Sequence, residues 1–230
     1  MAKKPLISVI IFPGSNCDRD LKVAIEKTLK KKVDMVWHKT ANIKKSDMIF
    51  VPGGFSFGDH LRAGILATKS PAMREVERLS KKGVPIIGIC NGFQILTECN
   101  LLPGILIKNR NPKFLCKSVN LKVDNNSIFT SSFKNNQIIK LPIAHSQGNY
   151  FADKKVLNSL EDNNQVIFRY CSAKGKINSN FNPNGSMNNI AGIINSSKNV
   201  LGLMPHPERA IDLTKQDDGI LFFKSLKMYL

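Results

Sequence analysis

The chain has 230 residues, and its 34 Lys and Arg against 17 Asp and Glu give a formal net charge of +17. A chain of this length lies near the upper range for one domain and can bury roughly 70–75% of its unfolded surface, so we expect a single domain over residues 1–230. No stretch approaches the ~20 apolar residues of a membrane-spanning helix, so we expect no membrane partner.

The first half of the chain alternates predicted strands with predicted helices. Apolar runs predict strands at residues 6–12, 33–37, 48–51 and 84–89. Helical periodicity predicts helices at residues 18–31, 61–68, 73–82 and 93–99. The run at 6–12 is short and lacks a small-x-small cleavage site after it, which favours a core strand over a signal peptide. Strands alternating with helices predict an α/β fold with a parallel sheet covered on both faces.

The second half has shorter segments, separated by Asn-Asn pairs that are typical of turns. We predict strands at residues 141–144, 166–170, 190–194 and 200–204, and a terminal helix at 219–229. The sequence Asn-Pro-Asn-Gly-Ser at 182–186 predicts a tight turn.

The positive charge has two interpretations, a surface for an acidic partner or a Lys-rich composition on solvated faces. The lysines form small groups along the whole chain, at residues 30–32, 44–45, 81–82 and 154–155. Aromatic residues do not interleave with them as a base-stacking platform requires, so we expect no nucleic-acid partner.

The five cysteines are an odd number without a Cys-x-x-Cys pair, which favours a reduced, cytoplasmic location over a disulfide framework. No Cys and His residues have zinc-site spacing, so we predict no metal centre.

A sharp turn after the strand at 84–89 provides the strongest chemical signal. Residues 88–92 read Gly-Ile-Cys-Asn-Gly, the spacing of a nucleophile elbow with Cys90 at its apex. The helix that follows begins at this cysteine, and its dipole and free N–H groups favour an anionic sulfur. Cys17 is the rival nucleophile, since it also precedes a helix, but it lacks the flanking glycines and is expected to be a buried thiol.

A cysteine nucleophile needs a base, and His206 is the best of the four histidines. It lies in Pro-His-Pro-Glu, just after the last predicted strand. The two prolines favour an extended backbone, in which residues two apart point the same way, so Glu208 can orient the imidazole. Cys90 and His206 both follow strands, and the carboxyl ends of strands are where open α/β sheets form their sites.

An acyl-transfer site also needs donors for an oxyanion. The backbone N–H of Asn91 follows the nucleophile directly and is one candidate. The loop of Gly53, Gly54 and Phe55 after the strand at 48–51 is the expected source of the second.

These residues resemble the class I, or triad, glutamine amidotransferases, and the glutaminase subunits of de novo purine biosynthesis in particular. The resembling segments are FPGSNCDRD (12–20), PGGFSFGD (52–59), GICNGFQIL (88–96), LPG (102–104), NPNGS (182–186) and MPHPERA (204–210). The resemblance implies a flavodoxin-like open sheet, mainly parallel, with helices on both faces.

The resemblance also implies roles for individual residues. Cys90 attacks the side-chain amide of glutamine, and His206 protonates the departing ammonia. Gln94 matches a position that contacts the substrate glutamine. Gly54, Phe55 and Asn91 match positions that bind the oxyanion and the amide.

Two segments depart from the pattern of the purine-pathway subunits. Ser146 and Gln147 stand where those subunits have Gly and Glu, in a loop that in related amidotransferases holds the α-groups of glutamine through its backbone. Backbone contacts survive this change, whereas a contact from the missing Glu side chain does not. His60 stands where an aromatic residue is usual, in a loop expected to face a partner.

The chain has no Walker-type phosphate loop, so it can release ammonia but shows no means of activating an acceptor. We therefore expect no cofactor in this chain and a synthetase partner that uses ATP and Mg²⁺. The resemblance implies the synthetase subunit of the same enzyme, with a small third subunit.

Two alternatives stay open at this point. The first is an elbow-cysteine hydrolase of related fold that acts on peptides or aldehyde adducts. The second is a non-enzymatic, basic nucleic-acid-binding domain with a structural cysteine.

Overall fold

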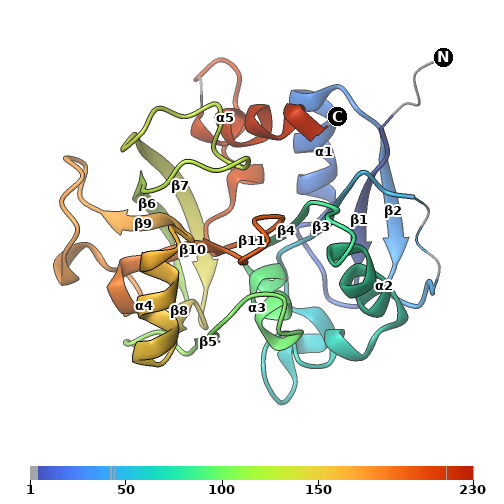
Figure 1. Ribbon diagram of the computed structural model, residues 1–230, viewed down its shortest axis with the longest axis horizontal. Coiled ribbons are helices and arrows are strands. Elements are labelled where there is room, and N and C mark those ends of the chain that lie inside the picture. Colours follow the sequence, from blue (N-terminus) through green and yellow to red (C-terminus); the bar gives the residue numbers. More distant parts are fainter. Residues whose placement is uncertain (1–4, 42, 44, 216, 230) are drawn as a thin grey trace.

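The computed structural model describes residues 5–41, 43, 45–215 and 217–229 of the chain. Its centre is a nine-stranded sheet in the order β2-β1-β3-β4-β11-β10-β9-β6-β7 (Figure 1). A second sheet pairs two short strands, β5 (Ile105–Ile107) and β8 (Asn149–Phe151). Within the described part of the chain, no helix is long and apolar enough to cross a membrane.

One half of the large sheet is parallel. It contains β2 (Val33–Trp37), β1 (Ile7–Ile11), β3 (Met48–Val51), β4 (Ile86–Ile89) and β11 (Val200–Leu203). All residues of β3, β4 and β11 are buried, as expected for strands covered on both faces. The order β2-β1-β3-β4 is that of flavodoxin-like sheets, and this part of the prediction is confirmed.

The other half is antiparallel. It contains β10 (Ile190–Ile194), β9 (Val166–Cys171), β6 (Leu115–Val123) and β7 (Ile138–His145). The open α/β class is thus confirmed, and the sheet is mixed. Three of its antiparallel pairs, β6–β7, β9–β10 and β10–β11, join consecutive strands with no α-helix among the described residues between them.

Five α-helices flank the sheet: α1 (Asp18–Leu29), α2 (Pro71–Ser80), α3 (Asn91–Glu98), α4 (Lys154–Asp162) and α5 (Asp218–Ser225). Helices α1 and α5 contact each other on one side of the sheet, and α3 packs on β3, β4 and β11 from the other (Figure 1). Helices on both faces were predicted and are confirmed.

The predicted helix at residues 61–68 is wrong. This segment consists of bends and turns that lead into the 3₁₀ turn Ala67–Lys69. Leu61 and Gly64 have positive φ angles of 67° and 83°. A Cβ on Gly64 would lie 2.9 Å from the backbone nitrogen of Ile95, so close packing on α3 replaces the helix here.

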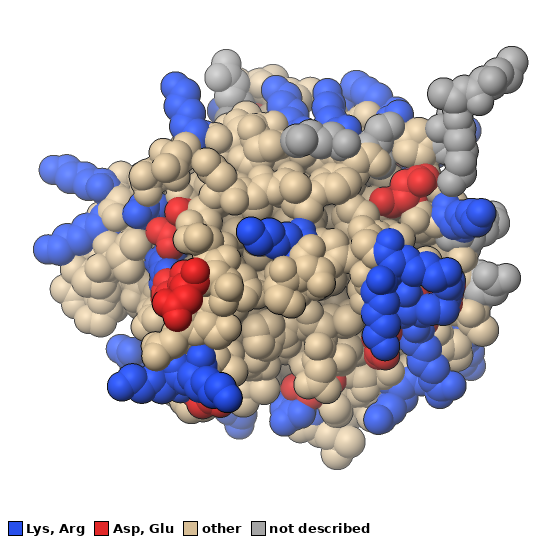
Figure 2. Space-filling view, viewed as in Figure 1, with Lys and Arg blue, Asp and Glu red and all other residues tan. Residues whose placement is uncertain are grey.

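Basic side chains are dispersed over several elements of the face in Figure 2, with acidic groups between them. They form separate groups, as the short lysine runs of the sequence predict.

Candidate active site

Cys90 occupies a strained turn between β4 and α3. Its φ of 51° and ψ of −105° belong to a region that non-glycine residues rarely adopt, as a nucleophile elbow requires. Gly92 makes this turn possible, because a Cβ there would lie 1.9 Å from the carbonyl oxygen of Val51. The thiol of Cys90 is 5% exposed and donates to the carbonyl of Ala144 at 3.6 Å.

His206 and Glu208 form a buried hydrogen-bonded pair beside this thiol. The imidazole Nδ1 lies 2.6 Å from Oε1 of Glu208, and the two side chains are 2% and 1% exposed. The backbone differs from the extended form predicted, because Pro207–Arg209 forms a 3₁₀ turn directly after His206. The expected contact is nevertheless present, since the tight turn also brings the carboxylate back to the ring.

Burial and neighbouring charges control the protonation of His206 and His145, two of the buried histidines. Burial alone would lower the pKa of His206, but the Glu208 carboxylate and then the Cys90 thiol hold it well above its ordinary value. Burial, and to a smaller extent the charge of His206, lowers the pKa of His145 to about 4. The pair therefore favours an imidazolium at His206 beside a neutral imidazole at His145.

Cys17 also lies in this site, which the sequence did not predict. It is 3% exposed and precedes α1, where it accepts a hydrogen bond from Nη2 of Arg209 at 3.3 Å. Its sulfur and one donor atom each of His206 and Glu208 all lie within 4.8 Å of one another. One signal in the sequence could have indicated this. Cys17 follows β1, and the carboxyl end of β1 lies at the same edge of the sheet as Cys90.

These side chains line a cavity of about 180 Å³. Its wall contains Asn16, Cys17, Gly54, Phe55, Cys90, Phe114, Cys116, Ala144, His206 and Arg209. The rings of Phe55 and Phe114 stack with centroids 6.4 Å apart and are 41% and 52% exposed as residues, so they form the outer part of the cavity.

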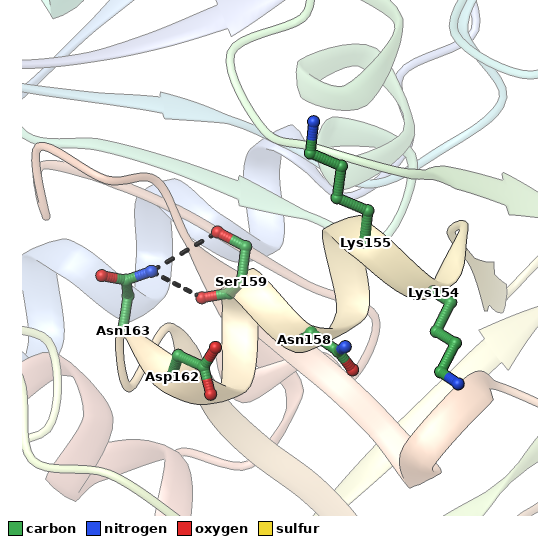
Figure 3. Close-up of a pocket in the computed structure, with 6 residues that line it drawn as sticks. All are labelled: Lys154, Lys155, Asn158, Ser159, Asp162 and Asn163. Atoms are coloured by element: carbon green, nitrogen blue, oxygen red, sulfur yellow. Dashed lines mark hydrogen bonds between the residues drawn. The ribbon is translucent and has the colours of Figure 1, made fainter.

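A larger hollow of about 590 Å³ lies over α4, far along the sequence from the elbow. Its lining comes from one face of α4 along its whole length, and Asn163 caps the helix by donating to the carbonyl and hydroxyl of Ser159 (Figure 3). It carries lysines and amides but no thiol or imidazole, so we assign the chemistry to the smaller cavity.

The loop of Gly53, Gly54 and Phe55 lies against both Cys17 and Cys90. A Cβ on Gly53 would lie 2.8 Å from Cε1 of His206, so only glycine fits beside the imidazole. The backbone N–H of Phe55 already donates to the carbonyl of Gly14 at 2.9 Å. This leaves the backbone of Gly54, with φ 141°, as the better oxyanion candidate of the loop.

Asn91 and Gln94 are buried on α3 and connect the elbow to two loops. The Asn91 amide accepts from the backbone of Ser56 at 3.1 Å and donates to Gln94 at 2.8 Å. Gln94 in turn donates to the carbonyl of Gln147 at 2.7 Å. The predicted residues of α3 and of the 145–148 loop are therefore adjacent.

Two buried asparagines that the sequence reasoning missed hold the loop at 145–148. Oδ1 of Asn109 accepts from the backbone of Gly148 at 3.0 Å and lies 3.1 Å from Nδ1 of His145. Its backbone N–H donates to the carbonyl of Ser146 at 2.9 Å. Asn184, within the predicted turn at 182–186, donates to the carbonyl of Gly148 at 2.7 Å. Ser146 and Gln147 therefore both accept these hydrogen bonds through their backbone carbonyls.

Comparison with known proteins agrees with this geometry. Residues 4–219 match the CobB/CobQ-like glutamine amidotransferase domain. The chain is 39% identical to a chain of PurLQS from Thermotoga maritima, with 99% of both chains covered and a TM-score of 0.86. A glutamine amidotransferase from Thermotoga maritima, at 14% identity, covers 99% of this chain and 94% of its own with a TM-score of 0.58, and shows the shared fold. The chain therefore belongs to the CobB/CobQ-like glutamine amidotransferase family.

Proposed function

We propose that this chain is the glutaminase subunit of a PurLQS-type phosphoribosylformylglycinamidine synthase, in de novo purine biosynthesis. The observation that carries the proposal is the buried pair of His206 and Glu208 beside the elbow thiol of Cys90. The family match and the 39% identity to a PurLQS chain support the same function and favour it over the other two hypotheses.

The proposed reaction begins when the sulfur of Cys90 attacks the side-chain amide carbon of glutamine. The carbonyl electron pair moves onto oxygen, and the backbone N–H groups of Asn91 and Gly54 stabilise that oxyanion. The C–N bond then breaks as His206 gives its Nε2 proton to the departing nitrogen. Ammonia leaves, and a γ-glutamyl thioester remains on Cys90.

Water completes the cycle. His206, now neutral, takes a proton from the water that attacks the thioester, and the C–S bond breaks to release glutamate. Glu208 holds the ring in one tautomer throughout, with Nδ1–H toward the carboxylate and Nε2 toward the reacting atoms. Gln94, Ser146 and Gln147 are proposed to border the bound glutamine.

Ammonia from this site is proposed to pass to a synthetase subunit, with a small third subunit completing the complex. ATP and Mg²⁺ belong to the synthetase in this proposal, and this chain holds no cofactor. Five free cysteines support a reduced, cytoplasmic setting.

The test is glutamine hydrolysis by the full chain, alone and with the synthetase and small subunits. Cys90→Ser should abolish hydrolysis and labelling by a glutamine-analogue electrophile, whereas Cys99→Ser should retain both. Label recovered on Cys17 instead of Cys90 would overturn the assignment of the nucleophile. A large rise in hydrolysis on complex formation would indicate that docking assembles the site.

A further inference from the structure

The sulfur of Cys17 has no role in the proposed reaction, yet it lies beside His206 and Glu208, which do have one. Cys17, His206 and Glu208 are all buried, and one donor atom from each lies within 4.8 Å of the other two. A buried thiol, imidazole and carboxylate this close together are the donor types that Zn²⁺ prefers.

The side chain of Cys90 also borders this space, through its Cβ, beside Gly53. An ideal Cβ on Gly53 would lie 2.8 Å from Cε1 of His206, 3.1 Å from Sγ of Cys17 and 3.4 Å from Cβ of Cys90. Three side chains from three segments thus converge on one small space, which forms part of the cavity described above.

The imidazole is already arranged as a metal ligand. Its Nδ1 faces Oε1 of Glu208 at 2.6 Å. Its Nε2 is buried and has no hydrogen-bond partner among the described residues. A carboxylate on one ring nitrogen with the other nitrogen free is the usual outer arrangement of a histidine that binds zinc.

We propose that this cavity is also a binding site for Zn²⁺, with Sγ of Cys17, Nε2 of His206 and Sγ of Cys90 as ligands. Glu208 keeps its place on Nδ1, and water occupies the fourth position. The two thiols and the imidazolium of His206 release their protons to solvent on binding, and no electron transfer occurs. The sulfur of Cys90 leaves the carbonyl of Ala144 and turns toward the metal.

Arg209 opposes the cation, since its Nη2 donates to the sulfur of Cys17 at 3.3 Å. Its Nε lies 3.1 Å from Asp20, however, and its side chain is 37% exposed. The guanidinium can therefore turn toward Asp20 and solvent when the metal binds, at the modest cost of a partly exposed contact.

Bound zinc would occupy both the nucleophile and the base. The expected consequence, which rests on the proposed function, is reversible inhibition of glutamine hydrolysis that a chelator removes. Zinc binding itself does not depend on that function, so the zinc proposal and the proposed function can be refuted separately.

The experiment uses the full chain, kept reduced and stripped of metal. Equilibrium dialysis should give one Zn²⁺ per chain, and Co²⁺ should produce a sulfur-to-metal charge-transfer absorption that Zn²⁺ displaces. Cys17→Ser should weaken Zn²⁺ binding by roughly tenfold or more. Cys99→Ser, at the end of α3, is the matched control and should bind as the parent chain does.

Absence of stoichiometric binding would overturn the proposal, as would unchanged affinity in Cys17→Ser. Loss of binding in Cys116→Ser, with Cys17→Ser unaffected, would also overturn it, because Cys116 is the exposed thiol of the cavity. If Cys17→Ser does not fold, Cys17→Ala and the loss of the cobalt absorption in Cys90→Ser provide the same comparison. A chain that binds zinc but, once freed of metal, does not hydrolyse glutamine even with the synthetase and small subunits would contradict the proposed function alone.

Discussion

Replacing Glu208 by Gln removes one charge from the buried pair while keeping its shape. The Gln oxygen can still accept from Nδ1 of His206, so the ring stays in contact, but the imidazolium loses its counter-charge. Neutralising the carboxylate that orients a triad histidine can lower kcat by up to about 10⁴-fold. Because Gln keeps the contact with Nδ1, we expect kcat to fall roughly 10²- to 10⁴-fold at pH 7.

The same substitution has a pH signature in stability. The folded pKa of His206 is raised, so its contribution to stability is fully present below the ordinary value of 6.5 and is lost as pH rises through the folded pKa. Glu208→Gln removes most of this contribution. The difference in free energy of unfolding between the parent chain and the variant should therefore be largest near pH 6 and shrink toward alkaline pH.

Steady-state glutaminase assays, urea unfolding at several pH values and NMR titration of the His206 ring measure these effects. Glu161→Gln is a matched control, because Glu161 pairs with Arg169 on a different part of the surface. A variant with more than a tenth of the parent kcat, or a stability difference that grows with pH, would refute the reasoning.

Three further substitutions test the surroundings of the elbow. Gly92→Ala places a Cβ 1.9 Å from the carbonyl of Val51, and it should lower the free energy of unfolding in urea by at least about 1–3 kcal/mol. Asn184→Ala removes the 2.7 Å donor of the buried Gly148 carbonyl and leaves it only the longer bond from the Ser186 hydroxyl at 3.2 Å. Glutamine kinetics should show KM raised by up to about tenfold with little change in kcat, and an unchanged KM would show that this loop does not support substrate binding. Burial raises the pKa of Asp59 from 3.8 to about 6 despite its hydrogen bond from Asn91, so Asp59→Asn should become stabilising as pH rises from 4 to 6, with no gain at pH 4; urea unfolding at pH 4 and 7 would show a pH-independent effect if this is wrong.

The parallel half of the fold was predictable because its strands are short apolar runs with clear ends. Residues 33–37 and 48–51 were predicted with the bounds that β2 and β3 have. In the antiparallel half, the same holds for residues 190–194 and β10. The elbow was equally clear from its two glycines. The structure explains them, because a Cβ on Gly88 or Gly92 would lie too close to neighbouring backbone atoms. Here local sequence and tertiary packing impose the same requirement.

The edge of the antiparallel half was not predictable in the same way. Strand β6 (Leu115–Val123) exposes three consecutive residues, Cys116, Lys117 and Ser118, so its sequence pattern resembles that of a polar loop. The helix α4 is short and only Leu157 and Leu160 on it are buried, so its apolar signal is weak. These elements are stabilised by neighbours that are distant in sequence.

The residues of the site also differ in how far local sequence could identify them. Sequence motifs identified Cys90, His206 and Glu208 because each lies in a short pattern with its own chemical reason. Cys17 was judged by its local context alone, as a thiol without flanking glycines. Its nearness to His206 arises because β1 and β11 both end at the same edge of the sheet, with β3 and β4 between them. Strand order decides which strand ends share a cavity, and in this chain it brings a second buried sulfur close to His206, the proposed base.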